Sequence, residues 1–223
     1  MTEPTTAPTT APTAAPTAGG GEAPPRAVPV LDSDTEDLAQ QVADQVESFL
    51  LALRAIAREG DGGSAVSLLL LEVSQVLLAG ARLGVLRDFT PDEEFQPDAG
   101  PDPDLDELRL RLAETLDGVD LYVEVLDPYG EPEVVPSTLS DDLASTAAAL
   151  AHGLRHHRAG RVLEALWWWQ FSYVASWGTE ASAALRALQS VVAHDRLDDD
   201  RMLDAEQVLA AGEMLAGQRT ARR

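Results

Sequence analysis

The spacing of apolar residues predicts a long first helix. Over residues 34–58, apolar side chains recur every three or four positions, which is the period of one face of an α-helix. Ser33 with Glu36 three residues later is a capping-box pattern, and it favours a helix start at this point. Glycines from Gly60 onward end the helix, and Ser64 can cap the next one.

A second helix follows over residues 64–86 and is apolar on nearly all of its sides. Such a helix belongs at the centre of a bundle. Gly80 and Gly84 lie one turn apart, so a neighbouring backbone can approach closely there. Because Glu72 and Arg82 interrupt the apolar run, we expect a buried core helix and no membrane span.

The segment 103–126 carries two competing patterns. Leucines and valines keep helical spacing from Leu105 to Leu126, yet Leu121, Val123 and Val125 also alternate with polar residues as in a strand. The helical series is longer and needs no partner strand elsewhere. We therefore predict a helix over 103–126, which Gly118 weakens. A connection rich in Pro and Asp, residues 88–104, precedes it.

Two further helices complete the predicted bundle. A turn begins at residues 127–130, and the loop continues to Pro136. Ser137 or Ser140 can cap a fourth helix, which has aspartates in its first turn and ends at Gly160. A fifth helix covers 161–194, and a last amphipathic piece covers 199–216. The chain is predicted to be an all-α bundle of about five main helices.

The predicted domain layout has three parts. Residues 1–31 form a Pro/Thr/Ala-rich tail, which is too poor in apolar residues to fold and is expected to be disordered. Residues 32–197 form the helical bundle, and residues 198–223 form a C-terminal helix with a basic tail. The tail has no basic and apolar regions of a signal peptide, so we expect a cytoplasmic protein.

Composition narrows the function classes. The 38 acidic and 16 basic side chains leave a formal charge of −22, which argues against direct nucleic-acid binding through the phosphates. The chain has no cysteine, which excludes disulfides, zinc thiolate sites and thiol nucleophiles. No nucleophile elbow, P-loop, dinucleotide fingerprint or zinc-protease motif occurs. We expect no catalytic residues, no metal and no cofactor.

Three separated motifs resemble one known family. The segments 122–128 (YVEVLDP), 140–143 (SDDL) and 169–173 (WQFSY), the last followed by Trp177 and Gly178, are similar to an uncharacterised bacterial family known as domain of unknown function 5063. The resemblance spans roughly residues 34–197 and implies no activity. Genes of that family often lie near recombination and nucleoid-associated genes, which implies at most a loose link to DNA maintenance.

The chain departs from the family pattern at two places. Glu180 stands where a histidine is common after the Trp-Gly pair, and residues 145–149 replace a more polar helix. Both departures lower the expectation of a polar site shared with the family.

Acidic residues near the first motif form one candidate site. On a helical reading, Asp120, Glu124 and Asp127 share a face, where they can hold a hard cation or engage arginines of a partner. In so acidic a chain, the favoured interpretation is a solvated face, because metal ligands usually converge from more than one element.

Histidines near the end of the fourth helix form a second candidate site. His152 and His156 lie one turn apart and can ligate a metal. Each lies two positions after a leucine of the buried stripe, so we place both on the solvent side. His157 is expected near the helix C-terminus, where the helix dipole favours a cation.

Aromatic residues concentrate on the fifth helix. Three consecutive tryptophans, 167–169, span about 200° of a helix, so they cannot all face one seam. One or two of them should lie at the bundle edge and cover the 127–136 loop or contact a partner. Trp168 is the candidate for exposure, and most of the cluster is expected to pack in the core.

These features support two functional hypotheses. The first is a non-enzymatic adaptor or regulatory domain that binds a protein partner, either a basic one or one acting in DNA maintenance. The second is a metal-dependent hydrolase in which Glu124, Asp127, Glu164 and a histidine converge in the bundle. Self-association through the second helix is a third reading, and the oligomeric state stays open. The partner-binding residues of the first hypothesis are Tyr122, Glu124, Asp127, Trp168, Trp169, Gln170 and Trp177.

Overall fold

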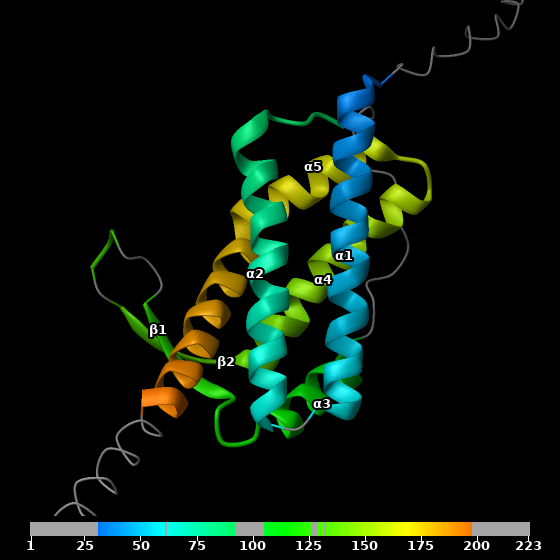
Figure 1. Cartoon of the computed structure of the whole chain (residues 1–223). Helices are drawn as coiled ribbons and strands as arrows, with labels where there is room; N and C mark the ends of the chain where they lie inside the picture. The colour runs from blue at the N-terminus through cyan, green and yellow to red at the C-terminus, as the bar shows by residue number, and fades with distance from the viewer. Residues whose placement is uncertain (1–30, 61, 92–104, 126–128, 132, 198–223) are drawn as a thin grey trace, which may run out of the picture. The chain divides into compact units, whose positions relative to one another are not determined.

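The computed structural model describes residues 31–60, 62–91, 105–125, 129–131 and 133–197. It confirms the all-α bundle and adds one small β-hairpin, drawn beside the last helix in Figure 1. The predicted tail (1–31, apart from Leu31), most of the 88–104 connection, the start of the 127–130 turn and the 199–216 helix lie outside the described residues. The first elements in chain order are α1 (Ser33–Glu59), α2 (Gly62–Leu86), α3 (Asp106–Thr115), β1 (Leu121–Val125) and β2 (Val134–Thr138). They are followed by α4 (Leu139–Arg158), α5 (Val162–Ser172), the π-helical segment η1 (Tyr173–Trp177) and a final helix over residues 178–197.

One apolar core joins the helices. α1 packs against α2, α3 and α4, and α4 packs along α5. Each fully buried Leu, Val or Phe side chain contributes about 1.5–3 kcal/mol of transfer free energy, so this core is the main source of stability. Its largest members, all essentially inaccessible to solvent, are Phe49, Leu53, Leu69, Leu83, Leu112, Leu116, Leu139, Leu143, Leu150, Leu166, Trp169 and Trp177.

The first two helices have the predicted extents, but two details of the prediction were wrong. The N-cap of α1 is Asp32, whose carboxylate accepts a hydrogen bond from the Thr35 amide, in place of the predicted Ser33. α2 is buried on one side only, because Leu68, Leu71 and Leu78 are exposed on the other. By length and composition alone, Gly63–Gly84 is apolar enough to cross a membrane, a test that core helices also pass.

The prediction of one helix over 103–126 was wrong, and the alternating pattern determines the second half of this segment. α3 ends at Thr115, Gly118 adopts a left-handed conformation with φ of 88°, and the chain then enters β1. β2 is the partner strand that the prediction lacked, and it pairs antiparallel with β1 with Val123 opposite Pro136. Pro132 and Pro136 made this segment resemble a loop in the sequence. Pro136 lies within β2, where a short edge strand tolerates one proline.

α4 begins and ends close to the predicted positions. Thr138 caps its N-terminus through the Asp141 amide, so the prediction of Ser137 or Ser140 as the cap was wrong by one or two residues. Asp141 and Asp142 occupy the first turn, as predicted. Gly160 ends the segment in a left-handed conformation with φ of 76°.

The predicted fifth helix is helical throughout but contains the π-helical segment η1 at Tyr173–Trp177. The Trp177 indole lies against Gly80 of α2, where a β-carbon would collide with the rings of Trp177 and Tyr173. Gly153 of α4 makes the same kind of space for the Trp169 indole. The structure thus has a close approach at Gly80, but the approaching groups are aromatic rings and not the predicted backbone.

Candidate functional site

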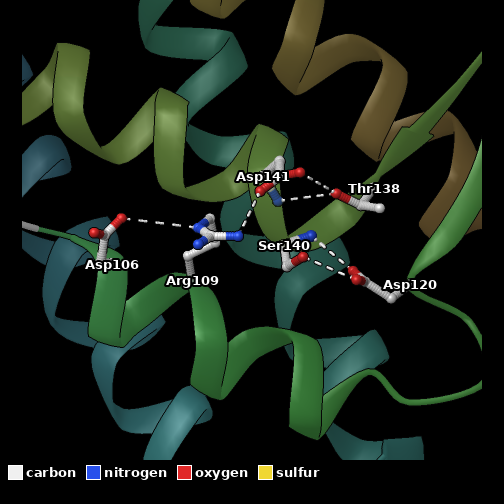
Figure 2. A network of polar contacts seen from close by, with 6 residues as sticks. All are labelled: Asp106, Arg109, Asp120, Thr138, Ser140 and Asp141. Atoms are coloured by element: carbon white, nitrogen blue, oxygen red, sulfur yellow. Dashed lines mark hydrogen bonds and ion pairs between the residues drawn. The ribbon is translucent and has the colours of Figure 1, made fainter.

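A network of polar contacts fixes the start of β1 against the start of α4, and Figure 2 shows it from close by. The Asp120 carboxylate accepts hydrogen bonds from the Ser140 amide and the Ser140 hydroxyl, both at 2.8 Å. The Asp120 carbonyl also accepts from the Leu139 amide at 2.9 Å. Because these bonds satisfy donors at the helix N-terminus, they hold the strand and the helix in one relative position.

An arginine of α3 extends this network. The Arg109 guanidinium lies 3.4 Å from an Asp141 oxygen and 3.9 Å from an Asp106 oxygen (Figure 2). These ion pairs are solvent-exposed, so each is worth at most about 1 kcal/mol. Their effect is to connect α3 to the first turn of α4, next to the hairpin.

Tyr122 of β1 is bound to a carboxylate in the first turn of α4. Its hydroxyl donates a hydrogen bond to Asp142 Oδ2 at 2.6 Å, and Ser137 Oγ lies 3.2 Å from both oxygens of the same carboxylate. Short O–H···O⁻ bonds of this kind are among the strong ones in proteins. The hairpin is thus attached to α4 through both of its strands.

The environment of this carboxylate disfavours its charge. Burial, with a smaller effect of the negative charges of Glu124 and Glu180, raises the pKa of Asp142 to about 6, although the hydrogen bonds from Tyr122 and Ser137 act to lower it. Burial and the bond to Asp142 also raise the pKa of Tyr122 above its ordinary value, so the phenol stays protonated.

A groove of about 810 Å³ runs beside β1. One wall consists of all five consecutive residues of β1, and the other comes from the helix 178–197. Since successive side chains of a strand point to opposite faces, a groove lined by every residue of β1 runs along the edge of the strand. The helical wall consists mainly of small side chains one turn apart, namely Thr179, Ser182, Ala183, Ala187 and Ser190, with Arg186, Val191 and His194.

The hairpin also presents an uncovered apolar face. Leu121 is 72% exposed and Val123 is 64% exposed, and Val125 and Val134 are exposed as well. Tyr122 and Glu124, which alternate with them, are partly buried on the other face. Contiguous apolar side chains left in solvent are typical of surfaces that another chain covers.

The structure brings together only part of the predicted partner-binding set. Tyr122 and Glu124 lie in β1 at the groove, while Asp127 lies outside the described residues. The predicted helical face of Asp120, Glu124 and Asp127 was wrong, because Glu124 is in a strand and Asp120 caps α4.

The aromatic members of that set pack elsewhere in the domain. Trp169 and Trp177 are 0% and 1% exposed. Trp168 is partly buried, and its indole donates to the Ala149 carbonyl at 2.9 Å. Gln170 donates to the carbonyls of Leu83 and Arg87, so it fastens the end of α2. These residues support the core and the helix ends, and the surface described above does not include them.

His157 lies in the last turn of α4, as predicted, but His156 does not lie on the predicted solvent side. His156 is buried at 1% exposure, so its predicted position on the solvent side was wrong. Burial lowers its pKa, and the neighbouring positive charges of His152, Arg161 and Arg155 lower it further. His152 is partly buried, and its ring centroid lies 4.0 Å from that of Trp168.

The predicted hydrolase site lacks the required convergence in the described part of the chain. There, no three His, Asp or Glu side chains are grouped so that they could hold a metal ion. Glu164 is buried in the first turn of α5, whereas Glu124 is in the hairpin.

Sequence reasoning missed three contributors to the site. Asp142 was assigned only to the helix dipole, Ser137 only to a cap, and Glu180 only to a departure from the family pattern. Asp142 and Ser137 meet Tyr122 because of the hairpin, and Glu180 acts on Asp142 through its charge; a strand assignment for 121–125 would have pointed to the hairpin. The helical wall of the groove carries no sequence signal beyond its small residues.

Comparison with known proteins supports the fold and assigns no activity. A family model described as a domain of unknown function, DUF5063, matches residues 33–194. The crystal structure of protein BF1032 from Bacteroides fragilis is similar, with a TM-score of 0.58 and 18% sequence identity. The match covers 70% of this chain and 92% of that one. No curated protein matches the sequence.

Proposed function

The chain belongs to DUF5063, a family of domains of unknown function, and we propose that its hairpin surface binds another protein. The observation that carries this proposal is the apolar face of the hairpin, left uncovered by the described residues beside an 810 Å³ groove. Burial of this face against a partner would remove apolar surface from water, which is the main driving force of most protein association.

The charges around the groove indicate which partner fits. Glu124 and Arg186 both line the groove, and the charges of Glu124 and Glu180 reach the half-buried carboxylate of Asp142. The whole chain carries −22, so a basic segment is attracted at long range as well. The partner in this proposal is a protein with a basic, partly apolar binding segment.

Other parts of the sequence interpretation stay predictions. These are a cytoplasmic location, expected because the tail lacks signal-peptide regions, and a link to DNA maintenance, implied by the family resemblance; the acidic charge fits the absence of direct DNA contact. The hydrolase alternative has no converging ligand set among the described residues.

Site-specific photo-crosslinking tests the proposal. A photoreactive residue at position 123 should form a discrete adduct in cells, whereas one at Leu51 of α1 should not, although the two side chains are equally exposed at 64% and 65%. The captured protein should then bind the purified full chain, and the binding should weaken as salt screens the charges. Identical adducts at the two positions, or none at 123, would contradict the proposed surface.

A further inference from the structure

The direction of the backbone groups of β1 follows from one backbone hydrogen bond and the strand register. The Leu139 amide donates to the Asp120 carbonyl, which continues the β1–β2 register by one pair. In an antiparallel ladder, hydrogen-bonded pairs alternate with non-bonded pairs. Tyr122 and Glu124 therefore direct their amide and carbonyl groups toward β2. The assignment agrees with Pro136, which has no amide hydrogen and sits in a non-bonded pair.

The intervening residues direct theirs away from β2. Leu121, Val123 and Val125 belong to the non-bonded pairs, so their amides and carbonyls point into the groove along the free edge. Within the described residues, the sheet contains β1 and β2 alone, so no third strand satisfies these groups. A strand edge of this kind is a template for pairing with another chain.

We propose that the groove accepts an extended segment of the partner as a third strand on β1. This inference rests on the proposed partner-binding function and adds its mode of recognition. The added strand would pair with the backbone groups of Leu121, Val123 and Val125 and lie against the small side chains of helix 178–197. Backbone pairing supplies affinity in such complexes, and alternate side chains supply specificity.

The two faces of β1 define the side chains of the incoming strand. Residues that join the face of Val123 extend an exposed apolar surface, so they are apolar. Residues that join the face of Glu124 lie beside its carboxylate at the groove, so they are basic. The ligand is therefore an extended segment in which apolar and basic residues alternate.

Peptide binding to the full-length protein tests this mode. The probe is a seven-residue peptide that alternates valine with lysine, and the control has the same composition in two blocks. The alternating peptide should bind at least about tenfold more tightly, measured by fluorescence anisotropy, because only this order matches both faces. An alternating valine–glutamate peptide should not bind.

Backbone methylation of the peptide isolates the strand pairing without a change in the protein. In an antiparallel complex the valine amides face β1, and in a parallel complex the lysine amides do. N-methylation of the amides that face β1, whether those of the valines or those of the lysines, should weaken binding about a hundredfold. N-methylation of the amides that face away should have little effect. Equal effects of the two methylation patterns would overturn strand addition.

A substitution in β1 provides the matching test on the protein side. Val123→Pro removes an amide that faces the groove and leaves the β2-facing amides of Tyr122 and Glu124 in place, so binding should weaken about tenfold. Val123→Thr keeps the amide and the β-branched shape, and it should bind like the natural chain. The methylated peptides decide the question if Val123→Pro does not fold.

The outcomes separate the two proposals. If the two-block control peptide and the N-methylated peptides bind as tightly as the alternating peptide, strand addition is wrong. The proposal of a basic partner still stands in that case. If no basic peptide binds, the proposed basic partner is wrong as well. If the free protein already protects the groove-facing amides, either as a dimer or through its own residues beyond 197, a foreign strand is not the occupant and the inference is overturned.

Discussion

The aromatic cluster of α5 and the β-hairpin are both rich in apolar side chains, and they differ in what surrounds those side chains. Trp169 and Trp177 pack against glycines, Gly153 and Gly80, which leave room for their rings. The apolar side chains of the hairpin have no such cover among the described residues. The aromatic cluster is thus part of a packed core, whereas the hairpin surface resembles one side of a protein–protein interface.

Hydrogen bonding shows the same contrast. The indole groups of Trp168 and Trp169 donate to the carbonyls of Ala149 and Leu150, and that of Trp177 donates to Trp169. The outward-facing amides of β1 have no strand partner in the described part of the chain. Abundant aromatic residues in a sequence are therefore a weaker guide to a binding surface than unsatisfied backbone at a strand edge.

Removal of a core indole should have the largest effect on stability. Trp169→Ala should lower the free energy of unfolding by about 3–5 kcal/mol, because it leaves a large cavity and removes the hydrogen bond from the indole to the Leu150 carbonyl. Urea denaturation followed by circular dichroism measures the change. A loss below about 1 kcal/mol would show that this indole is not part of a packed core.

Filling a glycine site beneath an indole should have the next largest effect. Gly153→Ala places a β-carbon against the Trp169 ring, so the free energy of unfolding should fall by about 1–3 kcal/mol. Gly63→Ala is the matched control, because nothing lies within 4 Å of its added β-carbon. Equal unfolding free energies for Gly153→Ala and Gly63→Ala would contradict tight packing of Trp169 on Gly153, and with it the contrast between core and hairpin.

The charge of Asp142 should make the hairpin region sensitive to pH. Its carboxyl should titrate near pH 6 in carbon-13 NMR spectra, because burial raises its pKa from the model-compound value of 3.8. A raised pKa favours the protonated form in the folded state, so this group's contribution to stability is complete below about pH 4 and is lost as pH rises to about 6.

Asp142→Asn is the control for that titration, because the amide does not ionise. The difference in unfolding free energy between the variant and the natural chain should change across pH 4–6 and stay constant above it. A titration midpoint near 4 would contradict the buried position of this carboxylate.

Substitution on the exposed hairpin face should have the smallest effect on stability. Val123→Thr should change the free energy of unfolding by no more than about 0.5 kcal/mol, because the side chain is already in solvent. Chemical denaturation measures this beside Trp169→Ala. A loss above about 1.5 kcal/mol would mean that the hairpin face is covered in the folded monomer.

Much of the bundle could be predicted from the sequence because helical periodicity and caps are local signals. The stripe in α1 and the aspartates in the first turn of α4 are examples, and they gave nearly correct boundaries. Residues 121–125 satisfied two periods at once, and their partner strand contains Pro136. Only the tertiary pairing resolves such a conflict, so β1 was missed.

The site could be predicted only in part for the same reason. Tyr122 and Glu124 stood out in a motif, but their contact with Asp142 follows from the hairpin register and the start of α4. His156 was misplaced because an assignment from the leucine stripe assumed that only one side of α4 is covered. In the structure, α1, α3 and α5 all pack on this helix, so more of its surface is buried.

Amide hydrogen exchange resolved by residue tests the central claim most directly. In the free full-length protein, the amides of Leu121, Val123 and Val125 should exchange rapidly, and those of Tyr122 and Glu124 should be protected by β2. Addition of the valine–lysine peptide should slow the first three and leave the other two unchanged. Protection that is uniform along β1, or that rises only at the exposed leucines of α2, would contradict the account.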